Sequence, residues 1–220
     1  MNPKELIARR VAQEIAPRSL VNLGIGIPTL VSDYLDESLG VFFQAENGAV
    51  GMGHRPPEGM TDRHLTDAGG RFVSFVPGAS TLDSAFSFGL IRGGHLDLTV
   101  LGALQVDEKG HLANWAIPGH YTPGMGGAMD LVTGAKKVIV AMQHTAKGES
   151  KIVPECTLPL TSQRQVDLIV TELAVMKPEE DGLHLLERAP NVPVEVIREM
   201  TAATLITSGE VPEMQLNACP

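Results

Sequence analysis

The chain has 220 residues, of which 43% are hydrophobic and 20% charged, and this composition excludes an intrinsically disordered protein. A chain of this length fits one domain with a substantial core. The formal net charge of −9 and the lack of any basic cluster argue against a nucleic-acid-binding surface.

The first expected element is an amphipathic helix at the N-terminus. Asn2 and Pro3 are suited to cap and open it, and apolar residues follow at helical spacing as far as Ile15. The segment carries acidic residues and no continuous apolar stretch, so it reads as neither a signal nor a transit peptide. Later apolar runs are only strand-length, so we expect no membrane span and a cytoplasmic protein.

Short apolar runs then alternate with helix signals. A strand within 20–28 runs into a glycine turn, and Pro28 is placed to open a helix through Tyr34. Further strands are expected at 41–44, 71–76, 96–106, 136–144, 166–176 and 183–189. Further helices are expected at 80–94, ending at paired glycines, and at 192–204; a turn is expected at 107–110 and a connecting loop at 118–135.

This alternation predicts an α/β fold in layers, with a largely parallel β-sheet flanked by helices. We expect a single domain over 1–206 and a loose C-terminal tail over 207–220. Ligands of such folds bind at the carboxyl ends of the strands. Glu46 follows the apolar run 41–45 and is therefore expected at such a place.

The stretch "VFFQAENGAVGMG", residues 41–53, allows three interpretations of Glu46. Asn47-Gly48 between apolar runs is typical of a β-hairpin turn, although two glycines and two prolines nearby make the following residues a poor partner strand. "LGIGIPT" with an acid 22 residues after Gly24 resembles a dinucleotide-binding motif, but Thr29 stands at its third glycine position. The third interpretation makes Glu46 a covalent nucleophile.

Nucleophilic attack by a glutamate on a thioester requires a carboxylate, unhindered N–H donors for the oxyanion, and exclusion of water. The carboxylate is ionised at neutral pH without a metal or a histidine. Besides Glu46, the chain offers the loop "GMGGAMD", residues 124–130, whose glycines leave backbone N–H groups accessible. As residues alone, these glycines also suit an ordinary connecting loop.

Other reactive residue types show no catalytic pattern. The seven histidines lack metal-ligand spacing, and His95 and His144 are expected to be loop or core residues. Cys156 and Cys219 lie far apart and suggest no disulfide framework, and Cys156 reads as a packed thiol. The chain has no Gly-x-Ser-x-Gly motif for a serine nucleophile.

Five segments in order resemble the beta subunit of class I CoA-transferases of the acetate, acetoacetate or 3-oxoacid type. The resemblance covers most of the chain, from the N-terminal helix to about residue 174. The segments are "VNLGIGIPTLV", "FQAENGAVGMG", "GASTLDSAFSFGLIRGGHLDLTVLGALQVDEKGHLANWAIPG", "GMGGAMDLVTGAKKVIVAM" and "CTLPLT".

The resemblance implies a ping-pong exchange of CoA between a short-chain acyl-CoA and a free carboxylic acid, through a glutamyl-CoA thioester. It implies Glu46 as the nucleophile, with CoA as a substrate and neither a cofactor nor a metal. The other implied site residues are Asn47 and Gly48 in the turn, Gly127 and Ala128 as oxyanion donors, Asn114 facing the acyl-CoA, and Gly24 and Gly26 lining the cleft.

The resemblance also implies an alpha subunit that completes the site, in an α2β2 heterotetramer, because the family's Gly-Gly-Phe-Gly loop does not occur here. The chain departs from the family at Ala49, where a bulkier aliphatic residue is usual, and becomes divergent from about residue 176. An acyl-CoA hydrolase with the same glutamate and a Rossmann-type nucleotide-binding module remain as alternatives. Acetoacetate, butyrate, acetate, succinate and 3-oxoadipate all remain possible acids.

Overall fold

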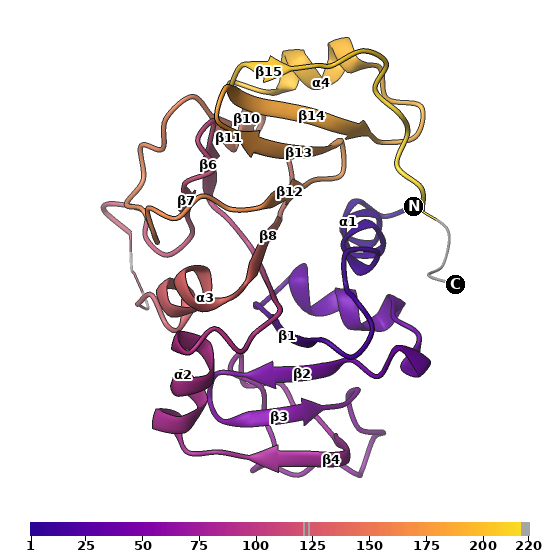
Figure 1. The fold of residues 1–220 in the computed structure, drawn as a ribbon, viewed down its shortest axis with the longest axis vertical. Helices are drawn as coiled ribbons and strands as arrows, with labels where there is room; N and C mark the ends of the chain where they lie inside the picture. Colours follow the sequence, from indigo (N-terminus) through magenta and orange to yellow (C-terminus); the bar gives the residue numbers. More distant parts are fainter. Residues whose placement is uncertain (121, 123, 217–220) are drawn as a thin grey trace.

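The computed structural model describes residues 1–120, 122 and 124–216. Cys219 and the last residues of the expected tail lie outside this part of the chain. Within it, 10 strands form one sheet, in the order β15-β14-β13-β12-β8-β5-β1-β2-β3-β4 (Figure 1). Their bounds are β15 (Leu205–Ile206), β14 (Gly182–Arg188), β13 (Ala174–Glu179), β12 (Leu168–Val170), β8 (Lys137–Ala141), β5 (Leu98–Leu101), β1 (Leu20–Leu23), β2 (Phe42–Ala45), β3 (Ala49–Met52) and β4 (Phe75–Thr81).

The middle of the sheet is parallel, as expected. Strands β12, β8, β5, β1 and β2 all run in one direction. On one side, β13 pairs antiparallel with β12 and β14, and β15 pairs parallel with β14. On the other side, β3 pairs antiparallel with β2 and β4. The carboxyl ends of β1, β2 and β5 therefore meet at one edge of the sheet. That edge is where an α/β fold offers a ligand site.

Both faces of the parallel region are buried in a hydrophobic core. Along β8, Val138 and Val140 pack on one face with α2 (Ser84–Arg92) and α3 (Ala128–Gly134), while Ile139 and Ala141 pack on the other with α1 (Pro3–Ala12). This alternation follows from the two-residue period of a strand. Figure 1 shows α2 and α3 on one side of the sheet and α1 on the other.

Smaller elements complete the layers. The 3-10 helices η1 (Pro28–Tyr34) and η2 (Glu37–Leu39) connect β1 to β2, and α4 (Val194–Met200) lies beside β15. A three-stranded sheet forms from β11 (Ile152–Val153), β6 (Gln105–Asp107) and β7 (Leu112–Ala113), and a two-stranded one from β9 (Thr145–Ala146) and β10 (Glu149–Ser150). No helix in the described part of the chain has the length and apolar character that a membrane crossing requires.

The predicted start of α1 at Asn2 and the predicted end of α2 at the paired glycines are confirmed, whereas α2 begins at Ser84 and not at residue 80, and α1 ends at Ala12, before Ile15. The Asn2 side chain accepts a hydrogen bond from the Lys4 N–H at 3.0 Å, and α2 begins with Asp83 accepting from the Phe86 N–H at 2.8 Å. Helix α2 ends at the predicted glycine pair, of which Gly94 has a φ of 72°. These local signals act within four residues, so the sequence reveals them.

Several expectations were wrong. Residues 28–34 form a 3-10 helix and not an α-helix, and the third strand covers 75–81, not 71–76. Residues 166–176 hold parts of two antiparallel strands, β12 and β13, because the chain turns between them. The loop expected over 118–135 contains α3.

The end of the described chain packs on the domain. Val211 and Met214 are buried, and Arg188 donates to Glu213 at 2.6 Å. Residues 207–216 therefore differ from the loose tail that we expected from residue 207, because two apolar side chains and an ion pair hold them to the sheet.

Candidate active site

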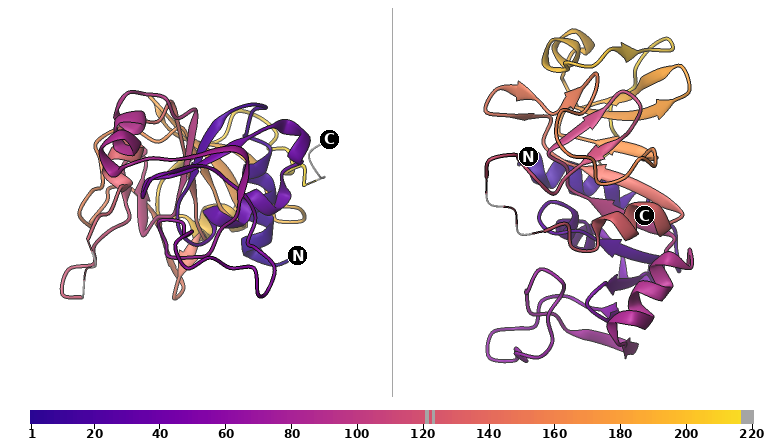
Figure 2. Two further views of the ribbon diagram at one scale, coloured as in Figure 1. Left: turned by 90° about the horizontal axis from the view of Figure 1, so that it is seen from below. Right: turned by 90° about the vertical axis from the view of Figure 1, so that its left-hand side faces the viewer.

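A cavity of about 1140 Å³ lies at the carboxyl ends of β1, β2 and β5. Its wall is formed by residues that follow these strands, by the loop between β3 and β4, and by the segment that leads into α3. The β3–β4 loop and the chain before α3 project from the same side of the molecule (Figure 2). Glu46, Gly24, Asn114, Gly127 and Ala128 all line this cavity.

Glu46 is the first residue of a hairpin turn between β2 and β3. The turn closes with the Gly48 N–H donating to the Ala45 carbonyl at 3.0 Å, and Ala45 pairs with Ala49. Residues 49–52 thus form the partner strand of a hairpin, contrary to our expectation that the glycines and prolines near them would prevent it. Gly51, with a φ of 88°, bends β3, and Gly51 packs so closely on Ala79 of β4 that a side chain would not fit.

The Glu46 carboxylate is held by a buried network of amides on the neighbouring strand. Asn22 of β1 lies beside Gln44 of β2, and its Nδ2 donates to Glu46 Oε2 at 3.1 Å and to Gln44 Oε1 at 2.9 Å. Gln44 Nε2 donates in turn to Ser87 Oγ on α2 at 2.9 Å. Asn22, Gln44 and Ser87 are at most 1% exposed, so the donor for Glu46 is fixed within the core.

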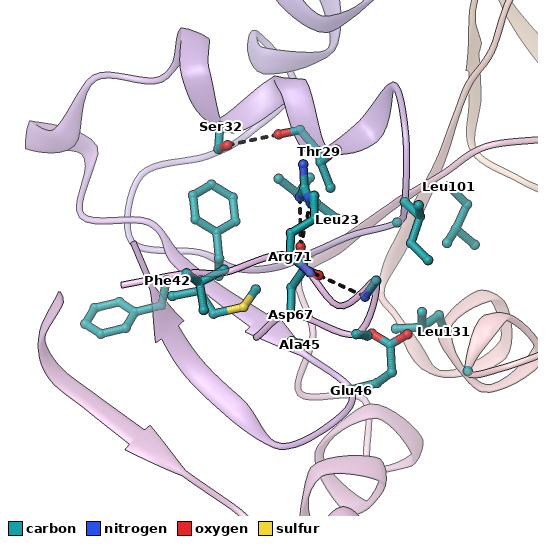
Figure 3. Close-up of a pocket in the computed structure, with 18 of the residues that line it drawn as sticks. Leu23, Thr29, Ser32, Phe42, Ala45, Glu46, Asp67, Arg71, Leu101 and Leu131 are labelled. Carbon is teal, nitrogen blue, oxygen red and sulfur yellow. Dashed lines mark hydrogen bonds and ion pairs between the residues drawn. The ribbon is translucent and has the colours of Figure 1, made fainter. Parts of the chain in front are cut away.

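Gly127, just before α3, packs directly on Glu46. A side chain at Gly127 would place its Cβ 3.1 Å from Glu46 Cγ, which is closer than an ordinary contact, and 3.5 Å from Oε1. In Figure 3 the Glu46 carboxylate points toward the side of the cavity where Leu131 of α3 lies. The glycine leaves the space beside the carboxylate open to a ligand and to backbone N–H groups.

The remaining predicted site residues fall into two groups. Gly24 lines the cavity and packs against Val100 of β5, and Asn114 lines it while donating to the Gly102 carbonyl at 3.2 Å. Asn47 and Gly48 do not line the cavity. The Asn47 side chain donates to the Thr66 carbonyl, and Gly48 packs on the Leu82 backbone, so both shape the turn.

Gly26 does not line the cavity either. Its φ of 95° suits the turn after β1. A Cβ added at Gly26 would meet no atom within 4 Å, so the residue is not required for close packing. The dinucleotide interpretation loses support here. It needs an α-helix whose first N–H groups bind a pyrophosphate, and η1 is a 3-10 helix opened by Pro28.

Several further residues belong to the site and were not predicted from the sequence. Asn22 and Gln44 are polar residues inside apolar strand runs, a pattern that signals a buried hydrogen-bond network. Asp67 and Arg71 of the β3–β4 loop also line the cavity and form an ion pair, with Arg71 Nη2 2.9 Å from Asp67 Oδ2 (Figure 3). The loop has no periodic pattern in its sequence from which the position of Asp67 and Arg71 in the cavity could be predicted.

His144 is a core residue and Cys156 is half-buried, and the pKa of each is shifted. His144 is fully buried between Thr171 and Thr201, and burial lowers its pKa to about 4. Burial, with the neighbouring Asp107 carboxylate, raises the pKa of the Cys156 thiol to about 12. Neither residue lines the cavity, so the assignment of both as packed side chains is consistent with the structure.

One group of potential metal ligands lies outside the cavity, on the β13–β14 hairpin. Ligand atoms of Glu179, Asp181 and His184 lie within 4.8 Å of one another. They are paired already, since Lys177 donates to Glu179 at 2.8 Å and His184 lies 2.7 Å from Asp181. Exposed acidic groups of this kind are common without a metal, and we assign them no role.

Comparison with known proteins finds coenzyme A transferases both by sequence profile and by pairwise identity. Residues 4–200 match the sequence profile described as "Coenzyme A transferase". The chain is 52% identical to the beta subunit of acetate CoA-transferase from Haemophilus influenzae, over 99% of this chain and 97% of that protein. It is 47% identical to the corresponding subunit of succinyl-CoA:3-ketoacid coenzyme A transferase from Helicobacter pylori, over 91% and 97% of the two chains.

A solved structure of similar fold is the acyl-CoA transferase apoenzyme of Escherichia coli. It superposes with a TM-score of 0.80 and 26% identity, and the match covers 98% of this chain and 44% of that chain. The present chain therefore spans less than half of the longer protein.

Proposed function

The chain belongs to the coenzyme A transferase family, and from this premise we propose that Glu46 is the nucleophile that carries CoA between acids. The chain is of the beta-subunit type. The observation that carries the proposal is the placement of Glu46 in a large cavity at the end of β2, held by Asn22 and packed on Gly127.

In the proposed reaction, a Glu46 carboxylate oxygen attacks the thioester carbonyl of an acyl-CoA. The tetrahedral oxyanion collapses as the C–S bond breaks, which gives a mixed anhydride and a CoA thiolate. The thiolate attacks the glutamyl carbonyl and the acyl group leaves as a carboxylate, so that Glu46 becomes a glutamyl-CoA thioester. A second carboxylic acid reverses both steps and departs as its own CoA thioester, leaving Glu46 free.

The surroundings of Glu46 suit two requirements of this chemistry, an oriented carboxylate and accessible backbone N–H donors. Asn22 orients one carboxylate oxygen, which leaves the other free to attack beside Gly127. We infer that backbone N–H groups near Gly127 and Ala128 stabilise the oxyanion, as such donors do in acyl transfer. The exchange conserves a high-energy bond, so we propose CoA as a substrate and no cofactor or metal.

We propose that an alpha subunit closes the cavity. Ile25 and Val76 line it while exposing 71% and 38% of their surface, and the chain matches 44% of a longer transferase. Exposed apolar residues at the rim of a site indicate coverage by a partner chain. An α2β2 assembly and a cytoplasmic location stay predictions.

The experiment uses the reconstituted two-subunit complex. Incubation with an acyl-CoA should attach CoA to the peptide that contains Glu46, as detected by mass spectrometry. Glu46→Gln should abolish the adduct and the exchange, whereas Glu37→Gln, a matched change on the same cavity wall, should leave both near wild type. Exchange by Glu46→Gln at the wild-type rate would refute the proposal.

The same assay separates the hydrolase alternative. An acyl-CoA hydrolase also forms the adduct, but it consumes acyl-CoA without an acceptor acid. A transferase holds the glutamyl-CoA thioester until an acid arrives, since its cavity excludes water.

A further inference from the structure

The β3–β4 loop places a positive charge in the cavity that the proposed nucleophile shares. Among the cavity-lining residues that the structure describes, Arg71 is the only arginine or lysine, whereas the lining acids are Asp36, Glu37, Glu46 and Asp67. The substrates of the proposed function are all anions. The excess of carboxylates repels an anionic substrate from the cavity. A cation fixed within the cavity offsets this repulsion by electrostatic attraction.

Arg71 is held in place by a nearly buried carboxylate. Asp67 Oδ1 accepts hydrogen bonds from the Gly69 and Arg71 N–H groups, both at 2.9 Å. Asp67 Oδ2 accepts from Arg71 Nε, also at 2.9 Å, and lies 2.9 Å from Nη2. The Asp67 side chain is 10% exposed and that of Arg71 is 55% exposed, so the pair is anchored at its acidic end.

The geometry leaves part of the guanidinium available to a ligand. A guanidinium has five N–H donors in a planar fork that matches a carboxylate. Two of the five point to Asp67, which leaves the donors of the Nη1 edge for a ligand. Figure 3 shows the Arg71–Asp67 pair inside the cavity that Glu46 also lines.

A monocarboxylic acid cannot use Arg71 while it reacts, because its single carboxyl group must lie at Glu46. A dicarboxylic acid has a second carboxylate to offer. We propose that Arg71 binds this second carboxylate, so that the enzyme prefers dicarboxylic acids or acyl groups over monocarboxylic ones of equal length. This inference rests on the proposed function and adds a substrate class to it.

The test compares succinate with butyrate, two four-carbon acids, as acceptors for acetyl-CoA in the two-subunit complex. Wild type should show a higher kcat/KM for succinate. Arg71→Gln should lower kcat/KM for succinate by about 10- to 100-fold, the loss expected for hydrogen bonds between charged groups, and change that for butyrate by less than about twofold. Arg71→Lys, which keeps the charge, should fall between wild type and Arg71→Gln for succinate.

Two further variants control this comparison. Arg63 lies exposed in the same loop and does not line the cavity. Arg63→Gln should therefore leave kcat/KM unchanged for both succinate and butyrate. Asp67→Asn should raise KM for succinate with little change in kcat, because Asp67 acts by positioning Arg71. A wild type without preference for succinate, or equal losses for both acids in Arg71→Gln, would overturn the proposal.

A phosphate of CoA is the other anion that Arg71 could bind. In that case Arg71→Gln would raise KM for acetyl-CoA with butyrate as acceptor, and with 3′-dephospho-acetyl-CoA the effect would vanish for the 3′-phosphate and persist for the pyrophosphate. That outcome also overturns the proposal. If the wild-type complex exchanges CoA with no acid at all, the proposed function is refuted, but the proposal for Arg71 is not yet tested. Calorimetric dissociation constants for succinate and butyrate, in wild type and Arg71→Gln, then decide the role of Arg71 separately.

Discussion

Gly127→Ala tests the contact between the α3 segment and the proposed nucleophile. Gly127 has φ −82° and ψ 0°, a conformation that alanine adopts, so the backbone itself adds no strain. The new Cβ would lie 3.1 Å from Glu46 Cγ, whereas carbon atoms prefer about 3.5–4.0 Å, so the carboxylate must move by roughly half an ångström. A misplacement of about 1 Å costs about a hundredfold in rate, and we expect kcat to fall about tenfold.

The assay measures kcat for CoA exchange by the complex, the single-turnover rate of adduct formation at Glu46, and the melting temperature. The melting temperature should stay level or rise slightly, because alanine restricts the unfolded chain. Gly102→Ala is the matched control: it lines the same cavity, and its Cβ would meet no atom within 4 Å. A Gly127→Ala enzyme with the same kcat as the control would show that Glu46 does not react from this position.

Three further predictions concern single side chains that are buried or half-buried. Ser87→Ala leaves the buried Gln44 amide without its acceptor, which costs about 1–3 kcal/mol and should lower the melting temperature by about 2–10 °C in calorimetry. The low pKa of His144, about 4, means that only the unfolded chain binds its proton between about pH 6.5 and 4. The free energy of unfolding in urea should therefore fall by up to about 3 kcal/mol over that range, a loss absent from His144→Asn. The raised pKa of Cys156, about 12, predicts alkylation at pH 8 roughly a thousandfold slower in the native than in the unfolded protein, by peptide mass spectrometry.

The sequence predicted the elements that local or periodic signals determine. The parallel strands are continuous apolar runs because both of their faces are buried, as β8 shows with Val138 and Ile139 in opposite cores. The start of α1 and the end of α2 depend on Asn2 and Gly94, which act within one helical turn.

The elements that the sequence did not predict depend on distant contacts. Helix α3 has seven residues, too few for a clear period, and its end is held by Arg164, which donates to the Val132 and Lys136 carbonyls from a loop about 30 residues away. In β3, Gly51 looked like a break in a strand. It is required there because β4 packs against it.

The candidate site shows the same division. The family motif located Glu46, Gly127, Ala128, Asn114 and Gly24, which the fold brings to one cavity although they span more than 100 residues. Asn22 and Gln44 carried only a weak signal, a polar residue in an apolar run. The Asp67–Arg71 pair gave no signal in the sequence, because its place in the site depends on how the long β3–β4 loop folds over the cavity.

The hairpin and the position of the proposed nucleophile are two consequences of one arrangement. The register that places Asn22 beside Gln44 is fixed by their buried hydrogen bond, since a slip of one residue would turn one of these polar side chains to the other face of the sheet. Glu46 leaves β2 two residues after Gln44, so its distance to the Asn22 amide is set by the same register and is as stable as the core. Arg71 belongs instead to a 22-residue loop outside the sheet, from 53 to 74, which can change without disturbing that core. Nucleophile geometry should therefore be constant among relatives of this chain, whereas the charge at position 71 should vary with the acid they accept.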